Sequence, residues 1–416
     1  MKFKGGEIWI INPYGTLPSE SWREYRSSLV SNALATRGHS VKWWMSNFEH
    51  RSKKFREIEF IDREGLHSNV EMRFIKSSSY KYHVSLERIL YERRFGINAL
   101  TSMRKHKPPD LIVMVDPSLF FGNYILKYCK ENKVKLIVDI QDLWPEQFEL
   151  AVPKRFRFLS KLLFFSLYIR RNRIIEYSTG VIGITKDYID EVLRKASIIN
   201  KPSIVSYLGV NLKDFQINKN RNEGASLDVI NQFVMDACIT CVYAGTLGEA
   251  YALDTLAQGI EKSILRNRNI KFIIAGSGSQ EDLVSSLASK YPTNILFLGS
   301  VDPKLLPYIY SKCDIGICSY SRGSVVSMPC KFYDYLAGGL AVLNSLGREI
   351  ESFINEKSIG INFKPEDVNS FSDSLNLYSS NKQILALHKS NASRLALNFD
   401  SPIIYNNLSE FVESFI

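Results

Sequence analysis

The stretch SMPCKFYDYLAGGLAVLNS, residues 327–345, says most about the fold of this chain. A Ser-x-Pro sequence opens a short helical segment, a Gly-Gly pair closes it, and an apolar strand-like run follows at once. Pro329 suits the first turn of a helix, and Gly338-Gly339 suits its C-cap. This order predicts a helix that leads directly into a buried strand, which is the repeating unit of an α/β sheet.

The start of this predicted helix is a candidate anion site. Unpaired backbone N–H groups and the positive end of the helix dipole would lie beside Lys331, a combination suited to a diphosphate. Asp334 follows one turn later and could accept hydrogen bonds from sugar or ribose hydroxyls. Ser327, Met328 and Pro329 form the approach to the helix. An ordinary helix–strand unit without a ligand is the alternative interpretation.

Short apolar runs alternate with helical segments along all 416 residues. The runs cover residues 7–14, 40–45, 69–75, 110–116, 135–140, 180–185 and 203–208 in the first half, and 238–245, 270–278, 295–301, 314–320, 340–345 and 360–364 in the second. Length and pattern predict two α/β domains, each with a parallel sheet covered on both faces. The polar stretch at residues 211–228 has no periodicity and is the predicted linker.

The composition is that of a globular protein, with 45% hydrophobic and 23% charged residues. No apolar run approaches the roughly 20 residues of a membrane-spanning helix, and no signal peptide opens the chain. The six cysteines are scattered, which indicates reduced thiols in a cytoplasm. Cys238 and Cys241 lie three apart on a predicted strand and point to opposite faces, and no second cysteine pair completes a zinc site.

Positive charge is concentrated in the first half. Residues 1–215 contain 36 Lys and Arg against 23 Asp and Glu, whereas the rest of the chain contains 17 against 20. Residues 154–173, KRFRFLSKLLFFSLYIRRNR, combine seven Lys and Arg with eight Phe and Leu side chains. This pattern predicts a basic amphipathic helix on an anionic membrane surface, with a helix packed inside the domain as the alternative. Aromatic-interleaved base-reading motifs are absent, so no nucleic-acid partner is expected.

Two Rossmann-like domains facing a central cleft form the GT-B architecture, and the residues resemble glycosyltransferase family 4. In the second half the resemblance is carried by YAGTLGEAYALDTLAQGI (243–260), FIIAGSGSQEDL (272–283), LFLGSV (296–301) and SMPCKFYDYLAGG (327–339). The first half resembles the branch that builds bacterial O-antigen and capsule glycans. Its marks are INPYGTLPSESWREYR (11–26), RGHSVKWWMSNF (37–48), VDIQDLWPE (138–146) and YLGVNLKDF (207–215).

The resemblance implies an acceptor-binding domain over residues 1–215 and a nucleotide-sugar-binding domain over residues 216–400. In such enzymes a C-terminal helix, here residues 401–416, returns to the first domain. Residues 401–416 have the apolar stripe that such docking needs, formed by Ile404, Leu408, Phe411, Val412 and Phe415.

Family 4 enzymes usually carry two glutamates eight positions apart around the helix at residues 327–339. The second falls on Asp334 and the first on Val326, which has no hydrogen-bonding side chain. The Arg and Lys that commonly follow the first donor-domain strand are replaced by Gly245-Thr246-Leu247-Gly248, which leaves Lys331 as the cation for the leaving diphosphate. A catalytically degenerate module that serves as a partner subunit therefore stays open, as does a nucleotide-sugar epimerase of the same fold.

The activity implied by the resemblance is retaining transfer of a sugar from a nucleotide sugar to a polyprenyl-diphosphate-linked glycan. The enzyme would be cytoplasmic and peripheral to the inner face of the plasma membrane. The sequence contains no Asp-x-Asp, so neither a metal nor another cofactor is expected. Besides the helix at residues 327–339, the expected donor contacts are Gly15, Gly245, Thr246, Gly276, Gly278 and Val301.

Acceptor contacts are expected where the first-half strands end. Asp142 directly follows the strand that ends at Ile140, and the carboxyl ends of parallel strands are where α/β sheets bind ligands. We expect Asp142 to orient the donor sugar or the acceptor hydroxyl, with a turn-capping role as the alternative. Asp142 and Lys331 are thus the catalytic candidates, and the acceptor candidates are Tyr14, Glu20, Trp22, Arg23 and Arg26.

Overall fold

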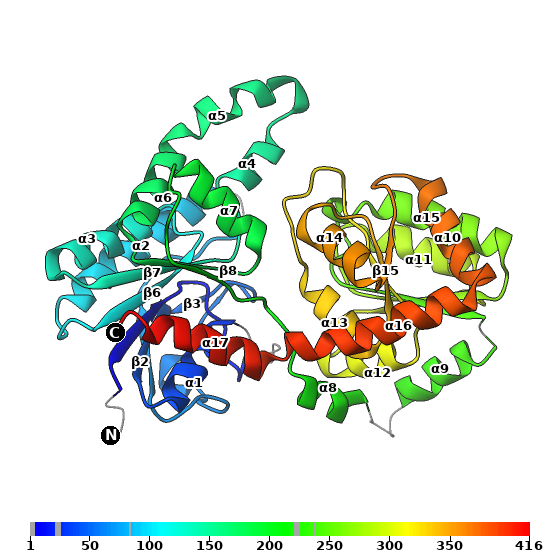
Figure 1. Cartoon of the computed structure of the whole chain (residues 1–416), viewed down its shortest axis with the longest axis horizontal. Helices are drawn as coiled ribbons and strands as arrows, with labels where there is room; N and C mark the ends of the chain where they lie inside the picture. Colours follow the sequence, from blue (N-terminus) through cyan, green and yellow to red (C-terminus); the bar gives the residue numbers. More distant parts are fainter. Residues whose placement is uncertain (1–4, 21–25, 83–84, 220–224, 237) are drawn as a thin grey trace. The chain divides into compact units, whose positions relative to one another are not determined.

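The computed structural model describes residues 5–20, 26–82, 85–219, 225–236 and 238–416. The chain divides into two compact units. Unit 1 contains Met1–Tyr207 and Pro402–Ile416, and unit 2 contains Leu208–Ser401. Figure 1 labels the helices and strands of both units.

Unit 1 is built on a seven-stranded parallel sheet with the order β5-β2-β1-β6-β7-β8-β9. Its strands are β1 (Glu7–Ile11), β2 (Ser40–Ser46), β5 (Val70–Ile75), β6 (Leu111–Asp116), β7 (Lys135–Ile140), β8 (Gly180–Gly183) and β9 (Ser203–Val205). A short antiparallel pair, β3 (Phe48–Glu49) and β4 (Lys54–Phe55), lies apart from this sheet and was not predicted. Every residue of β6 is buried, as expected for a strand covered on both faces.

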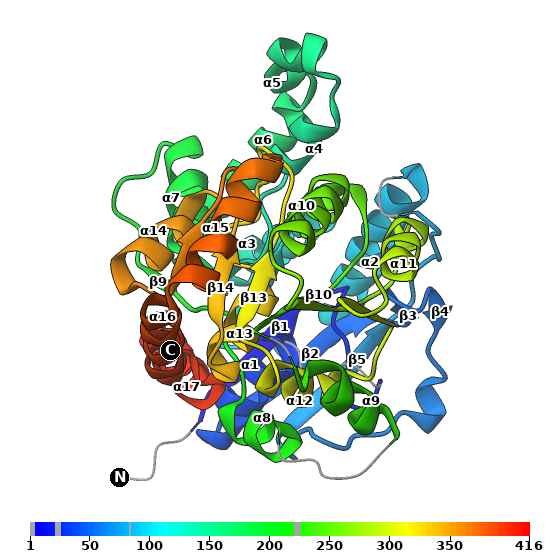
Figure 2. The same cartoon turned by 90° about the vertical axis from the view of Figure 1, so that its right-hand side faces the viewer.

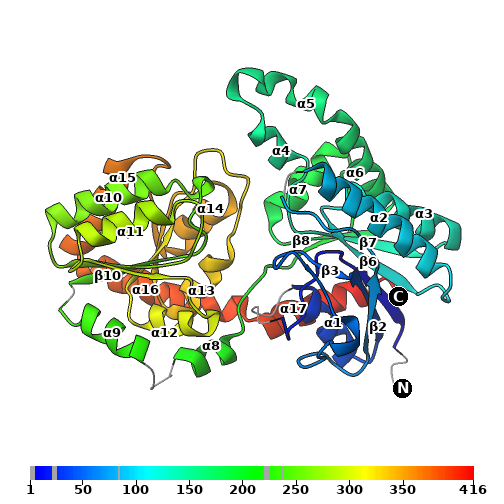
Figure 3. The same ribbon diagram turned by 180° about the vertical axis from the view of Figure 1, so that it is seen from behind.

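Helices cover both faces of the unit 1 sheet. One face carries α1 (Arg26–Thr36) and α17 (Ser401–Glu413), and the other carries α2 (Leu86–Met103), α3 (Gly122–Asn132) and α6 (Phe165–Tyr177) (Figures 1 and 3). The remaining helical segments of the unit are η1 (Ile58–Phe60), α4 (Glu146–Ala151), η2 (Lys154–Leu159), α5 (Ser160–Leu163) and α7 (Lys186–Lys195).

Unit 2 is built on a six-stranded parallel sheet with the order β12-β11-β10-β13-β14-β15. Its strands are β10 (Ile239–Ala244), β11 (Ile270–Ala275), β12 (Ile295–Gly299), β13 (Ile315–Cys318), β14 (Ala341–Asn344) and β15 (Gly360–Asn362). Its helices are α8 (Leu212–Lys219), α9 (Ala225–Val234), α10 (Leu253–Arg266), α11 (Glu281–Lys290), α12 (Leu306–Ser311), α13 (Cys330–Gly338), α14 (Arg348–Lys357), α15 (Val368–Ser380) and α16 (Lys382–Ala396). Short 3-10 turns are η3 (Glu249–Tyr251), η4 (Pro303–Leu305) and η5 (Leu397–Phe399).

Residues 327–345 form the predicted helix and strand, α13 and β14. Pro329 is the N-cap residue of α13 with extended backbone, one position before the first-turn site expected for it. Gly339 is the C-cap in the left-handed conformation, at φ +69°, which glycine adopts without strain. Residues Lys331 to Ala337 are all buried, so α13 is a core helix of unit 2.

All thirteen predicted strands are present, but two other predictions are wrong. The predicted linker at residues 211–228 carries α8 and the start of α9. The predicted single helix at residues 154–173 is instead η2, α5 and the first part of α6, because the backbone at Phe164 leaves helical geometry. The side chain of Arg171 in this stretch is buried in an ion pair with Glu146, at 2.7 Å.

The last helix, α17, packs on unit 1. Its stripe is buried at Ile404, Leu408 and Val412, of which the latter two are 0% exposed. At its C-terminal end, Glu413 accepts hydrogen bonds from both sides of the Arg37 guanidinium and lies 3.0 Å from the ring of buried His39. Since these partners belong to the N-terminal part of the chain, unit 1 is assembled from both ends of the sequence.

Candidate functional site

Both sheets reverse their strand order at one point. When the strands of unit 2 are numbered along the chain with β10 as strand 1, their order across the sheet is 3-2-1-4-5-6. The order therefore reverses between β10 and β13. The order of unit 1 reverses in the same way between β1 and β6. The carboxyl ends of strands at such a reversal are the usual ligand site of open α/β sheets. The candidate site therefore has two parts, one in each unit.

In unit 2 the central feature of this edge is Lys331. Its side chain is buried, and within the described residues its ammonium group has no hydrogen-bond partner. Three aromatic rings surround it, with the Nζ atom 4.0 Å from the centre of Tyr243, 5.2 Å from Tyr251 and 5.6 Å from Tyr320. Burial lowers the pKa of Lys331 to about 8. An ammonium held among ring faces and without a carboxylate is arranged to receive an anion.

Gly245, which follows β10, makes room for this ammonium. A Cβ atom on Gly245 would lie 2.9 Å from Lys331 Nζ, and its φ of +147° is a value that only glycine adopts readily. The other two donor-contact glycines of unit 2, Gly276 and Gly278, are needed for a different reason. A Cβ on Gly276 would lie 1.8 Å from the carbonyl oxygen of Gly245, and one on Gly278 would lie 2.2 Å from that of Leu247. These two glycines allow the loops after β10 and β11 to pack backbone against backbone.

The other donor-site candidates occupy varied positions in unit 2. Ser327 is fully buried, and its hydroxyl has no partner within the described residues. Met328 is buried just before α13, and Asp334 is buried on the helix itself, three residues after Lys331. Thr246 is exposed and Val301 half-buried. Val326, at the position of the first family glutamate, donates its backbone N–H to the Ser324 hydroxyl at 3.3 Å.

At the sheet edge of unit 1, Tyr14 belongs to a network that the sequence did not reveal. Its hydroxyl donates to buried Glu92 at 2.5 Å and accepts from Arg88 at 3.3 Å. The Arg88 guanidinium also lies over the ring of Trp144, at 4.3 Å. Burial raises the pKa of Glu92 to about 7, against the lowering effect of Tyr14 and Arg88. The network therefore holds a carboxyl group that can exchange a proton near neutral pH.

Two aspartates lie near this network. Asp116 ends β6 and is 1% exposed; its Oδ1 accepts from the Ser118 backbone N–H and hydroxyl, whereas Oδ2 has no partner within the described residues. Burial raises the pKa of Asp116 to about 6. Asp142, after β7, is exposed. Desolvation by surrounding protein atoms raises the pKa of the Asp142 carboxyl to about 6, and the Arg88 guanidinium opposes this rise.

Three of the remaining unit 1 candidates have structural partners. Arg26 is buried and forms a two-bond ion pair with Asp139, at 2.8 and 2.9 Å. Glu20 pairs with Arg56 at 2.5 Å. Gly15 packs on Trp43, since a Cβ there would lie 2.5 Å from the indole ring.

Trp22 and Arg23, the other two acceptor candidates, lie outside the described residues. A search of the described residues for groups of three or more His, Cys, Asp and Glu arranged for a metal ion finds none.

Part of unit 2 is similar in sequence to a family of known proteins. Residues 238–381 match the family model of glycosyl transferases group 1. Part of the chain is 27% identical, over 186 residues, to an uncharacterized glycosyltransferase of Methanocaldococcus jannaschii. That match covers 43% of this chain and 45% of the relative, which is less than half of either.

Solved structures similar to the whole chain give its fold. Anabaena HepE in complex with UDP-glucose has a TM-score of 0.67 at 11% identity, covering 99% of this chain and 100% of that one. Sucrose-phosphate synthase from Thermosynechococcus elongatus has a TM-score of 0.71 at 14% identity, covering 98% of both chains. WaaG, a glycosyltransferase involved in lipopolysaccharide biosynthesis, has a TM-score of 0.63 at 11% identity, covering 97% of this chain and 98% of that one.

The chain therefore has the GT-B fold, with parallel sheets in two Rossmann-like domains, and the predicted fold class is confirmed. The sequence match adds that unit 2 carries the pattern of a group 1 glycosyltransferase domain. Identity to the solved structures is too low to transfer any substrate from them.

Proposed function

We propose that the protein is a retaining glycosyltransferase that takes its sugar from a nucleotide diphosphate sugar bound by unit 2. The observation that carries this proposal is the Lys331 ammonium, which is buried among three tyrosines at the strand reversal without an acceptor in the described residues. A diphosphate would supply the missing anion. The group 1 pattern over residues 238–381 supports the same assignment.

The role of Lys331 follows from the reaction. Transfer breaks the bond between the sugar C1 atom and the diphosphate oxygen, so negative charge grows on the leaving diphosphate while C1 becomes electron-poor. A fixed ammonium beside the diphosphate stabilises that charge, and a single group of this kind changes the rate by about 10- to 1,000-fold. Asp334, one helical turn from Lys331, is assigned to the ribose hydroxyls. Neither role requires a metal ion.

Asp142 is assigned to orient the donor sugar or the acceptor hydroxyl. It lies at the carboxyl end of β7 in unit 1, exposed to solvent and able to accept a hydrogen bond from a hydroxyl group. Its neighbour Trp144 stacks with Arg88, which links this turn to Tyr14. We assign the acceptor to unit 1 and propose that it is a polyprenyl-diphosphate-linked glycan of a bacterial surface polysaccharide.

The test combines UDP binding with turnover of UDP-, GDP- and dTDP-sugars. Lys331→Met should weaken nucleotide binding at least tenfold and lower transfer or hydrolysis by 10- to 1,000-fold. Asp142→Asn should lower turnover and leave nucleotide affinity unchanged. Lys357→Met removes an exposed lysine of the same unit and should change neither. A wild-type protein that binds none of these nucleotides would contradict the proposal and favour the partner-subunit interpretation.

We also propose that unit 1 docks on an anionic membrane through an arm formed by residues 146–165. The arm projects from the unit 1 sheet (Figures 1 and 2). Seven of its large apolar side chains are exposed, from 36% at Leu150 to 77% at Phe158, the others being Phe156, Leu159, Leu162, Leu163 and Phe165. Exposed Arg155, Arg157 and Lys161 lie among them. Apolar groups interleaved with basic ones suit the headgroup region of anionic lipids. No helix of the described residues is long and apolar enough to cross a membrane.

Vesicle flotation tests this arm. Replacing Phe158, Leu162 and Leu163 by Ser should weaken binding to anionic vesicles at least tenfold, because each buried apolar side chain contributes on the order of 1 kcal/mol or more. Ile199→Ser removes an apolar side chain that is 91% exposed elsewhere in unit 1 and should leave binding unchanged. Equal loss in both variants, or equal binding to neutral vesicles, would contradict membrane docking by the arm.

A further inference from the structure

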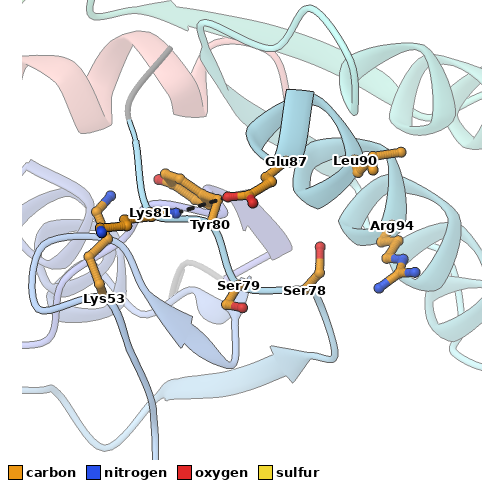
Figure 4. A pocket seen from close by; sticks show the side chains of 8 residues that line it. All are labelled: Lys53, Ser78, Ser79, Tyr80, Lys81, Glu87, Leu90 and Arg94. Carbon is orange, nitrogen blue, oxygen red and sulfur yellow. Dashed lines mark hydrogen bonds between the residues drawn. The ribbon is translucent and has the colours of Figure 1, made fainter. Parts of the chain in front are cut away.

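Unit 1 contains a cavity of about 530 Å³ that none of the predicted site residues lines. Three segments form it: the turn between β3 and β4, the chain after β5, and one side of α2 (Figure 4). The lining side chains are Lys53, Ser78, Ser79, Tyr80, Lys81, Glu87, Leu90 and Arg94. Three of these are cationic and one is anionic. The cavity is within the size range of sites for small ligands.

Two polar atoms of the cavity lack hydrogen-bond partners in the described part of the chain. They are the Lys53 ammonium and the Ser78 hydroxyl, and both are buried at the level of the atom. The Lys53 Nζ atom lies 4.0 Å from the centre of the Tyr80 ring, and no carboxylate of the described residues pairs with it. Burial and repulsion from Arg88 lower the pKa of Lys53. A buried donor without a partner destabilises the empty protein, so the pair is arranged for an acceptor-rich ligand.

The backbone of Lys53 supports this assignment. Its φ is +59°, in the left-handed region where non-glycine residues are uncommon. A glycine would suit this turn better, and the strain on a lysine is of the kind found at ligand-binding positions. The Lys53 ammonium lies over the Tyr80 ring, at the cavity wall.

The cavity lies at the same edge of the sheet as Tyr14 and Asp142. Lys53 and the chain at 78–81 follow the carboxyl ends of β2 and β5, and all strands of the sheet are parallel. Arg88 connects the two places, since its guanidinium lies 5.9 Å from the centre of the Tyr80 ring and 4.3 Å from that of Trp144. A ligand in the cavity would therefore reach toward the groups assigned to the acceptor.

We infer that this cavity binds a phosphate or diphosphate group of the acceptor, with Lys53 and Ser78 as its donors and Lys81 and Arg94 as surrounding positive charge. The identification of the ligand as the acceptor rests on the proposed glycosyltransferase function; the affinity for a phosphate group does not. A phosphate supplies several acceptor oxygens for the two orphaned donors and balances the excess positive charge of the cavity.

The first experiment measures binding of inorganic pyrophosphate to the full chain by calorimetry. Because the Lys331 site also fits a diphosphate, the measurement uses protein saturated with UDP. Lys53→Met should weaken pyrophosphate binding at least tenfold, while Lys53→Arg retains most of it. Lys54→Met removes the adjacent exposed lysine and should change binding less than twofold. Equal affinities of the Lys53→Met and Lys54→Met variants, or no pyrophosphate binding by the wild type, would overturn the inference.

A second measurement does not depend on the folding of any variant. Amide hydrogen exchange in the wild type, read by mass spectrometry, should be slowed by pyrophosphate in the turn between β3 and β4 and not in α7. Equal protection of both, or of neither, overturns the site.

Farnesyl diphosphate and glucose 1-phosphate then separate the two sources of such a phosphate, a lipid carrier and a phosphorylated sugar. Displacement of pyrophosphate by either compound supports phosphate binding in the cavity, and displacement by neither compound overturns it. UDP binding at Lys331 tests the proposed function separately, and Lys53→Met should leave UDP binding unchanged.

Discussion

The two strand reversals of this protein hold buried charges of opposite sign. In unit 2 the buried group is the Lys331 ammonium, which has ring faces around it and no carboxylate partner in the described residues. In unit 1 the buried groups are carboxyls, Glu92 and Asp116, of which Glu92 is bonded to the Tyr14 hydroxyl and lies 3.8 Å from Arg88. Burial moves the pKa values toward neutrality from both directions, to about 8 for Lys331 and to about 7 and 6 for Glu92 and Asp116.

This difference indicates a difference in ligand. A cation without a partner is stabilised when an anion arrives, so the unit 2 site suits a diphosphate. A carboxyl that shares hydrogen bonds with a phenol is already partly satisfied, and it suits hydroxyl groups and proton exchange. We therefore propose an anion site in unit 2 and a hydroxyl-binding edge in unit 1.

The largest effect is expected from removing α17, which belongs to unit 1 alone. Cutting the chain after Asp400 removes four core side chains of the unit, Ile404, Tyr405, Leu408 and Val412, and the partner of Arg37 and His39. Each buried side chain contributes about 1.5 to 3 kcal/mol, so the truncated chain should aggregate or unfold. A soluble truncation with a normal melting temperature would contradict this dependence.

Two point variants measure how much single side chains of α17 contribute to this stability. Leu408→Ala should lower the free energy of unfolding by about 2 to 5 kcal/mol, because Leu408 is fully buried. Ile403→Ala on the same helix is the matched control, since its side chain is 52% exposed. Chemical denaturation measures both.

Gly245→Ala should break the anion site of unit 2 without touching unit 1. The new Cβ would lie 2.9 Å from Lys331 Nζ, and the backbone at φ +147° disfavours alanine by about 1 to 3 kcal/mol. We expect UDP affinity to fall at least tenfold together with a lower melting temperature. Gly323→Ala is the control, because Gly323 also has a positive φ but its Cβ would meet nothing within 4 Å. Equal UDP affinities of the two variants would show that Gly245 does not position Lys331.

The sequence predicted most of the fold because both sheets are built from continuous apolar runs. The two short strands β3 and β4 were missed since two-residue strands leave no periodic pattern. The segment at residues 154–173 was misjudged because periodicity does not report the break at Phe164. Nor does it reveal that Arg171 pairs with Glu146, which lies 25 residues away along the chain.

The site was predictable only where its residues are neighbours in sequence. Lys331 could be found because it follows a Ser-x-Pro helix start, whereas the rings around it come from three separate segments. The buried ion pair of Arg26 was not predicted, because its partner Asp139 is 113 positions away in the sequence. The Lys53 cavity gave no signal, since its three segments meet only in the folded unit.

Asp116→Asn tests the buried carboxyl group of Asp116 in unit 1. The pKa of Asp116 is raised to about 6 by burial, so the folded state favours the neutral acid and wild-type stability falls as the pH rises from about 4 to 6. Asparagine is neutral throughout, so the variant should gain about 1 to 3 kcal/mol relative to wild type between pH 4 and pH 7. Asp190→Asn, at an exposed position, should show no such pH-dependent difference. A constant difference for Asp116→Asn would mean that the pKa of this carboxyl is the same in the folded and the unfolded protein.

The pH dependence of UDP binding tests the Lys331 ammonium of unit 2. Its expected effect is the smallest of these predictions. In the free protein the pKa of Lys331 is lowered to about 8 by burial, and a bound diphosphate would raise it again by favouring the ammonium. Binding above pH 8 must therefore take up a proton, so UDP affinity should be constant from pH 7 to 7.5 and fall about three- to tenfold between pH 8 and 9. Lys331→Arg keeps its charge over this range and should remove the dependence. Calorimetry in two buffers of different ionisation enthalpy measures the proton uptake directly. An affinity that stays flat to pH 9 in the wild type would mean that the diphosphate does not contact this ammonium, and the anion site of unit 2 would have to be sought elsewhere along the edge.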